Sequence, residues 1–187
     1  MNYELRYATH PNDAKTYDTA KLREEYAITN LMTPGEITLV YSLIDRFITA
    51  GAVPTSTPLT LETIDYLKAD YFAERREIGI INVGQSGTVI ADGVSYAIKH
   101  KEALYIGRGT KDIQFASDDA SNPALFYINS TPAHASYPTK HITQEQAEIV
   151  HLGSIDNSNE RQINKLIVNS VVETCQLQMG MTQMKTG

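Results

Sequence analysis

The sequence predicts a mainly β fold, an antiparallel sandwich or barrel. From residue 37 onward, short runs rich in Ile, Val, Tyr and Phe follow one another, and turns containing Gly, Asp or Pro separate them. Asp92-Gly93, between two such runs, is the strongest hairpin signal. The segments between the runs are too short for the helical crossovers of a parallel sheet, so we expect antiparallel pairing.

Composition sets the class of protein. The 187 residues carry a net charge of −6, with 16 Lys and Arg against 22 Asp and Glu. This balance argues against nucleic acid as a partner. The single Cys175 cannot pair within the chain, the start carries Glu4 and Arg6 instead of an apolar leader, and no apolar run is long enough to cross a bilayer. We therefore expect a reduced, cytoplasmic protein without a membrane partner.

Residues 1–35 are predicted to form an arm. Asp18 is a capping residue, and Leu22 and Tyr26 lie four positions apart, which predicts a short helix over 18–26. Residues 36–133 then form the main barrel, because apolar residues alternate with polar ones from Ile37 onward. We expect a brief helix at 61–68, and strands at 37–43, 71–83, 87–91, 94–98, 103–106, 112–116 and 125–129.

Residues 134–163 are polar and contain Pro, which is typical of a connector. Within them, Thr143 and Gln146 match a capping box at the start of a short helix. Alternation returns at 165–172 and 176–182, which predicts two more strands in 164–187. The last of these has no partner left in the sequence, so we expect the beginning of a second, truncated unit.

Several candidate motifs have simple structural interpretations. Gly84 and Gly87 precede a strand and not a helix, so they predict a hairpin and not a phosphate loop. Cys175 has no basic neighbour and is interpreted as a buried structural residue. His134, His141 and His151 fall in the connector, where solvated or capping roles are favoured over a zinc site.

The densest charge cluster is Glu74-Arg75-Arg76-Glu77. Strand alternation would place Glu74 and Arg76 on one face, and Arg75 and Glu77 on the other. One interpretation is cross-strand ion pairing at a sheet surface. The other is a carboxylate and a guanidinium lining a barrel, where an arginine clamps an anionic substrate. The residues alone favour the ion-pairing interpretation.

The run from Glu77 to Asp112 resembles a cupin. A cupin strand carries His-x-His shortly before such a Glu and a further His after a later turn, but here Tyr71 and Ala73 precede the cluster, and Lys111 or Asp112 follows. Of four metal ligands only Glu77 is kept. One carboxylate cannot hold a catalytic metal, which needs about three protein ligands. We therefore expect a degenerate cupin barrel without metal ligands.

The whole chain resembles the first two thirds of the 5-keto-4-deoxyuronate isomerase family, which has two cupin barrels. The resemblance rests on Asp45-Arg46, Pro132-Ala133-His134, Met179-Gly180 and the runs at 71–77, 115–117, 137–140, 161–165 and 173–177. It implies a ketol-isomerase of pectin degradation that converts 4-deoxy-L-threo-5-hexosulose uronate into 3-deoxy-D-glycero-2,5-hexodiulosonate. It also implies a homo-oligomer, and zinc held in a C-terminal barrel that is missing from this chain, which we expect to be inactive alone.

The chemistry implied by the family is a metal-assisted proton transfer through an enediol. Its substrate, a small uronate keto acid, carries a carboxylate that a basic side chain should meet. The candidates are Arg75, Arg76, Arg46 and Lys140; no catalytic residue is assigned. The alternative is a stand-alone, non-catalytic cupin that binds a sugar acid or acts as an oligomerisation module.

Overall fold

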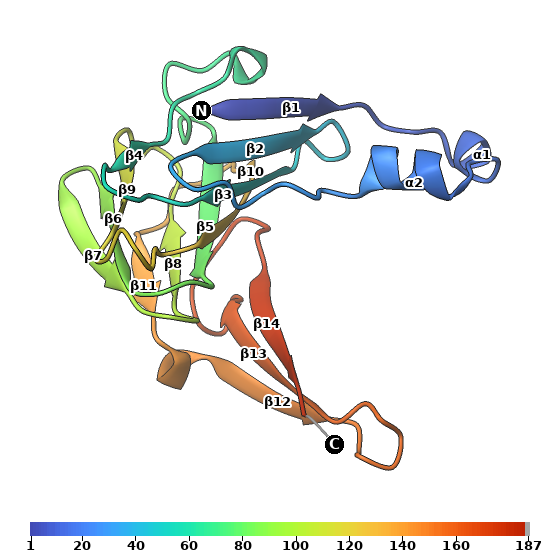
Figure 1. Ribbon diagram of the computed structural model, residues 1–187. Helices are drawn as coiled ribbons and strands as arrows, with labels where there is room; N and C mark the ends of the chain where they lie inside the picture. The colour runs from blue at the N-terminus through green and yellow to red at the C-terminus, as the bar shows by residue number, and fades with distance from the viewer. Residues whose placement is uncertain (186–187) are drawn as a thin grey trace.

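The computed structural model describes residues 1–185, whose strands form three sheets (Figure 1). The largest sheet has seven strands, and every neighbouring pair is antiparallel except β1 and β2, which are parallel. Its strands in spatial order are β1 (Asn2–Arg6), β2 (Ile37–Ser42), β3 (Ile48–Ala52), β10 (Phe126–Pro132), β5 (Arg76–Asn82), β8 (Ala103–Ile106) and β11 (Lys140–Ile142). The first strand therefore attaches part of the expected arm to the sheet.

A four-stranded antiparallel sheet packs against one face of the large sheet. It consists of β4 (Leu59–Thr60), β9 (Ile113–Ser117), β6 (Gly87–Ala91) and β7 (Val94–Ile98). The main core lies between the two sheets and includes Leu39 and Ile78 from one, and Val89 and Phe115 from the other. The predicted mainly β, antiparallel fold is therefore confirmed, in the form of a two-sheet sandwich.

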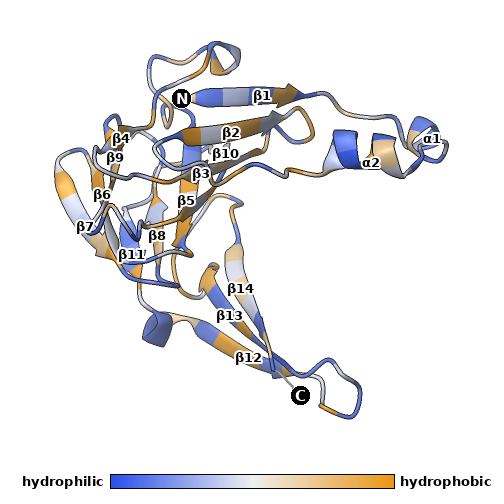
Figure 2. Ribbon diagram, viewed as in Figure 1, coloured by the Kyte–Doolittle hydropathy of each residue, from blue (hydrophilic) through white to orange (hydrophobic). Residues whose placement is uncertain are grey.

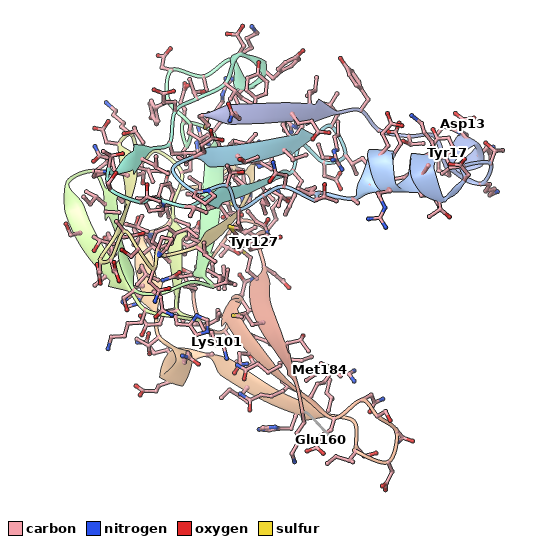
Figure 3. The ribbon with its side chains drawn as sticks, viewed as in Figure 1. Asp13, Tyr17, Lys101, Tyr127, Glu160 and Met184 are labelled. Carbon is pink, nitrogen blue, oxygen red and sulfur yellow. The ribbon has the colours of Figure 1, made fainter. Side chains whose placement is uncertain are left out.

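A third sheet, β12 (Glu148–Leu152), β13 (Arg161–Ile167) and β14 (Met179–Met184), extends from the opposite face of the large sheet (Figure 1). A second apolar cluster joins the two sheets and includes Tyr105, Ile167 and Leu177. Strand β5 lies between both clusters, and all its residues are buried. Figure 2 shows this strand as mainly hydrophobic. Figure 3 places Glu160 and Met184 at the far end of the third sheet, away from Tyr127 on the large one.

The predicted helix of the arm is confirmed as α2 (Thr19–Tyr26). Its cap is Asp18, whose carboxylate accepts the backbone N–H of Lys21 at 2.8 Å. A short helix, α1 (Pro11–Ala14), precedes it, and both project from the sheets (Figure 1). Neither helix has a buried residue. No helix within residues 1–185 is long and apolar enough to span a bilayer.

The hairpin prediction is confirmed: β6 and β7 have the predicted bounds, and Asp92 and Gly93 between them have φ of 46° and 82°. The strand expected at 71–83 is partly wrong, since β5 begins only at Arg76. The helix expected at 61–68 is only the 3-10 turn η1 (Asp65–Leu67). Local hydrogen bonds account for both differences, because the Glu74 carboxylate and the Arg75 guanidinium bind backbone groups of residues 67–70.

Two expectations for the C-terminal part are wrong. The segment 134–163 contains β11 and β12 as well as the 3-10 turn η2 (Gln144–Gln146), which carries the expected capping box. The strand expected without a partner is β14, and it pairs antiparallel with β13, which begins at Arg161. Strand β12 pairs with the other edge of β13. Partners for these strands thus come from residues whose polar sequence suggested a loop. Residues 186 and 187, the end of the predicted segment 164–187, lie outside the described residues.

Candidate functional site

A hollow of about 550 Å³ opens at one end of the seven-stranded sheet, a volume in the range of small-molecule sites. Six segments line it: the end of β2 with the turn that follows, the η1 turn with the residues after it, the start of β5, the turn after β8, the end of β10 with the residues after it, and the segment that contains Gln176. The antiparallel register brings β5 and β10 together, since Pro132 pairs with Arg76. Its lining includes Arg46, Arg75, Arg76 and Arg108, and we call it the arginine hollow.

Arg76 is the deepest of these side chains, only 4% exposed. Its Nε donates to the Ser130 hydroxyl at 3.1 Å, and its Nη2 donates to the carbonyl oxygens of Ser130 and Arg46, both at 2.7 Å. The Tyr41 ring lies 5.8 Å from the guanidinium carbon. Burial lowers the pKa of Arg76 from 12.5 to about 10, with Tyr41 opposing and Arg46 adding to the effect. The group therefore stays charged at neutral pH, and its Nη1 bonds to no atom of residues 1–185.

Arg108 is positioned by backbone carbonyls alone. Its Nε donates to the Glu74 carbonyl at 3.1 Å, and its Nη1 donates to those of Ala133 and His134 at 3.2 and 3.3 Å. These acceptors come from the segment before β5 and the segment after β10, so the guanidinium connects the two. Its Nη2 makes no hydrogen bond within the described chain and can donate to a ligand.

Arg75 and Arg46 complete the set and are both exposed. The Nη2 of Arg75 donates to the carbonyls of Leu67, at 3.0 Å, and Lys68, at the end of η1. The Arg46 side chain has no hydrogen-bond or ion-pair partner in residues 1–185. Arg46 itself has φ of 52°, in the tight turn between β2 and β3.

The arginine hollow has no negative charge of its own. No Asp or Glu lines it, and none of the four arginines takes part in an ion pair of the described residues. Burying a guanidinium without a carboxylate is costly unless another anion compensates the charge. Because planar guanidinium groups bind carboxylate and phosphate oxygens in pairs, this arrangement can bind an anion.

The structure brings three of the four predicted substrate-binding residues together. Lys140 lies elsewhere, on β11, and its Nζ donates to the Val171 carbonyl. Arg108 was not among the predicted residues, although Gly107-Arg108-Gly109 follows a predicted strand directly. Of the two interpretations of the Glu74 to Glu77 cluster, surface ion pairing is wrong, since Arg76 and Glu77 are buried and neither forms an ion pair within residues 1–185.

Glu77 lies on the opposite face of β5 from Arg76 and is fully buried. Its carboxylate oxygens accept five hydrogen bonds from backbone N–H groups and hydroxyls: Cys175 N at 2.8 Å, Gln176 N at 2.9 Å, Leu177 N at 2.8 Å, the Tyr105 hydroxyl at 2.8 Å and the Thr131 hydroxyl at 3.3 Å. Burial and this carboxylate together raise the pKa of Tyr105 far above its ordinary value. Glu77 therefore anchors the segment that leads into β14.

These residues do not fit a metal. Glu77 uses both oxygens for N–H and O–H donors, and the described chain holds no group of three or more His, Cys, Asp or Glu suited to an ion. The three histidines of segment 134–163 lie in different places: His134 lines the hollow, the His141 ring forms a hydrogen bond with Glu102 at 2.9 Å, and His151 lies on β12.

Cys175, expected to be buried, is half-buried. Its Sγ lies 3.4 Å from the nitrogen of Ala135 and 3.5 Å from its oxygen. Its side chain thus contacts the backbone of Ala135, while its own N–H binds Glu77.

Comparison with known proteins places this chain in a family. The model of the KduI/IolB family matches residues 29–187. The chain belongs to the KduI/IolB family. A 4-deoxy-L-threo-5-hexosulose-uronate ketol-isomerase of Formosa agariphila is 56% identical over 185 residues, and an isomerase of the same name, numbered 1, from Bacteroides thetaiotaomicron is 50% identical over 186 residues.

The chain spans 66% of the length of each of these two relatives, which in turn match 99% and 100% of the chain. A crystal structure of an IolB-like protein from Salmonella typhimurium is 14% identical, with a TM-score of 0.50 over 68% of this chain and 46% of that one. At this low identity, the likeness shows a shared fold and nothing about activity.

Proposed function

We propose that this chain acts in a ketol-isomerase that converts 4-deoxy-L-threo-5-hexosulose uronate into 3-deoxy-D-glycero-2,5-hexodiulosonate during pectin degradation. Membership in the KduI/IolB family supports this, as do relatives that are named for that isomerisation. Within this enzyme, the arginine hollow binds the carboxylate of the sugar acid. Three of its arginines, Arg46, Arg75 and Arg76, are those for which the sequence suggested this role.

One observation carries the proposal: the buried Arg76 guanidinium has no carboxylate partner among the described residues and faces a hollow open to solvent. A substrate carboxylate would compensate its charge and accept the free N–H groups of Nη1. Hydrogen bonds from Arg76 to Ser130 and to the Arg46 carbonyl fix the guanidinium before a ligand arrives, so little conformational entropy is lost on binding.

The isomerisation step requires more than a site that binds an anion. Isomerisation moves a proton between neighbouring carbons through an enediol, and a metal ion that polarises the carbonyl assists this. Zinc, implied by the family resemblance, has no suitable ligand set in residues 1–185, so these residues receive no metal-dependent step. The proposal further includes a homo-oligomer in the cytoplasm.

The second candidate is a binding module that holds a sugar acid without converting it. The same hollow favours it, because its four arginines suit the holding of an anion and no Asp or Glu lines it, which leaves His134 as the lining side chain that could act as a base. In this second candidate the chain recognises the uronate and carries out no proton transfer.

Nuclear magnetic resonance of the uronate substrate, mixed with the purified 187-residue chain, tests the binding that both candidates share and shows whether this chain converts the substrate by itself. Broadened substrate signals without product support binding by this chain, and new product signals assign the isomerisation to its own residues. Unchanged signals at a large excess of chain would contradict the carboxylate site. Arg23 lies on α2 outside the hollow, so the Arg23→Gln variant should give the same substrate signals as the parent chain.

A further inference from the structure

The charge of the arginine hollow is larger than one carboxylate can compensate. Four guanidinium groups line it without any Asp or Glu. The substrate of the proposed function carries a single carboxylate, which would leave three positive charges uncompensated. Like charges held close together repel one another, and Arg46 already contributes to lowering the pKa of Arg76. A ligand with more negative charge would relieve this repulsion further.

The free N–H groups are also distributed over separate segments. The Nη1 of Arg76 comes from β5, the Nη2 of Arg108 from the turn after β8, and the guanidinium of Arg46 from the turn between β2 and β3. None of these groups has a partner within residues 1–185. Donors from three separate segments can bind more than one anionic group, whereas a single carboxylate offers two oxygens.

The rest of the molecule does not attract anions. The whole chain, with the four arginines included, has a net charge of −6, so its long-range field repels a multiply charged anion. Affinity for such a ligand must therefore arise inside the hollow, where the low-dielectric walls strengthen the local field. The hollow is also roomy, at about 550 Å³.

From these observations we infer that the arginine hollow selects anions with two or more negative charges, such as a chain of two or more uronate units, over a single monocarboxylate sugar. The inference keeps the hollow as an anion site, as in the proposed function, and goes beyond it, because the preferred ligand carries more negative charge than the monocarboxylate substrate. A compact dianion such as phosphate shares this chemistry, so it serves as a separate arm of the test.

The test is isothermal titration calorimetry of the full 187-residue chain with three probes: galacturonate, digalacturonate and inorganic phosphate, at about pH 8, where phosphate carries close to two charges. We expect digalacturonate to bind about tenfold more tightly than galacturonate, because it accepts at least one more charge-assisted pair of hydrogen bonds. Its affinity should also fall more steeply with added salt. Strong binding of phosphate but weak binding of digalacturonate would support the charge rule and assign the site to a compact dianion.

Two results would overturn the inference, and they are distinguishable. Equal affinities for galacturonate, digalacturonate and phosphate contradict the selection by charge but leave the carboxylate site of the proposed function intact. No heat with any probe contradicts both.

A pair of variants localises the effect. Arg46→Gln removes an exposed guanidinium without a hydrogen bond in the described chain, so folding should be preserved, and we expect the preference for digalacturonate to shrink severalfold. Arg23→Gln removes the same charge from α2 and should leave the preference unchanged. Equal effects of the two variants would show that the preference reflects overall charge and not the hollow.

Discussion

The carboxylate of Glu77 accepts the backbone N–H of Leu177 at 2.8 Å, across 100 positions of the chain. The N–H groups of Cys175 and Gln176 bind the same carboxylate. Three consecutive N–H groups thus converge on one fully buried side chain of β5. This anchor holds the segment that leads from the second apolar cluster into β14, and it explains why that segment is not part of a strand.

The anchor and the arginine hollow are neighbours through Gln176. Its backbone N–H binds Glu77, its side-chain amide donates to the Pro132 carbonyl at 2.8 Å, and it lines the hollow. Pro132 in turn pairs with Arg76. Adjacent residues of β5 therefore serve two roles on opposite faces: Arg76 supplies positive charge to the hollow, and Glu77 fixes one of its walls.

Replacing Glu77 with Gln should destabilise the protein strongly. An amide offers only one acceptor oxygen, and its NH₂ group would face N–H donors, so buried donors would lose their partner. We expect the free energy of unfolding to fall by roughly 3 kcal/mol. Urea denaturation followed by circular dichroism measures this. The exposed Glu62→Gln variant is the control and should stay within about 0.5 kcal/mol of the parent. Equal effects of both variants would show that the anchor is not important for stability.

Tyr105 predicts a specific dependence on alkaline pH. Its hydroxyl donates to Glu77, so Tyr105→Phe should lower the free energy of unfolding at neutral pH by about 1.5–3 kcal/mol. Burial raises the pKa of Tyr105 far above its ordinary 10.0, so in this range only the unfolded chain releases the proton. The contribution of Tyr105 is therefore complete below pH 10 and declines above it, by about 1.4 kcal/mol per pH unit.

The stability difference between the parent and Tyr105→Phe should consequently narrow above pH 10. Arg76, whose pKa is lowered to about 10, has the opposite effect, since its folded form loses the proton first and stability rises with pH. Arg76 is present in both proteins and cancels in the difference. Urea denaturation at several pH values gives the comparison, and a difference that stays constant above pH 10 would refute the assignment.

The local parts of the fold could be predicted from the sequence, and the non-local parts could not. The hairpin of β6 and β7 depends on Asp92-Gly93 and on alternation within a few residues, so its bounds were predicted correctly. By contrast, β1 has only five residues and pairs in parallel with β2, a strand more than thirty positions later. Neither a turn motif nor periodicity carries that information.

The candidate site shows the same division. Arg75 and Arg76 were identified because they form a dense charge cluster in the sequence. Arg108 was missed because its partner, the Glu74 carbonyl, is 34 positions away and is reached only through the register of β8 against β5. The role of Glu77 was missed for a related reason, since its donors come from Cys175 to Leu177 and the sequence indicated a vestigial metal ligand instead.

Gly107→Ala should damage both the fold and the hollow. A Cβ at this position would overlap the backbone carbonyl oxygen of Tyr137, which cannot move as a side chain tip can. We expect a loss of about 1–3 kcal/mol in the free energy of unfolding. Because Arg108 follows directly, the displaced turn should also weaken anion binding in calorimetry.

The matched control for this variant is Gly93→Ala. Its Cβ would meet nothing within 4 Å, but its φ of +82° is unfavourable for alanine, at a cost of about 1–2 kcal/mol. Similar losses of stability are thus expected for both variants, whereas only Gly107→Ala should lose anion affinity. If Gly93→Ala weakens anion binding equally, the effect arises from general destabilisation.

Substitutions of Arg108 and Lys140 should affect anion binding differently, although of these two residues the sequence suggested only Lys140 for substrate binding. Arg108→Gln keeps a polar side chain but removes the charge and the free Nη2 donor, so we expect the affinity for galacturonate to fall about tenfold. Lys140→Gln removes a charge whose Nζ donates to the Val171 carbonyl outside the hollow, so we expect no change. Calorimetry at one ionic strength compares the two, and thermal denaturation confirms that each variant is folded. A larger loss for Lys140→Gln than for Arg108→Gln would place the anion near β11, and the arginine hollow would then have to be abandoned as the binding site.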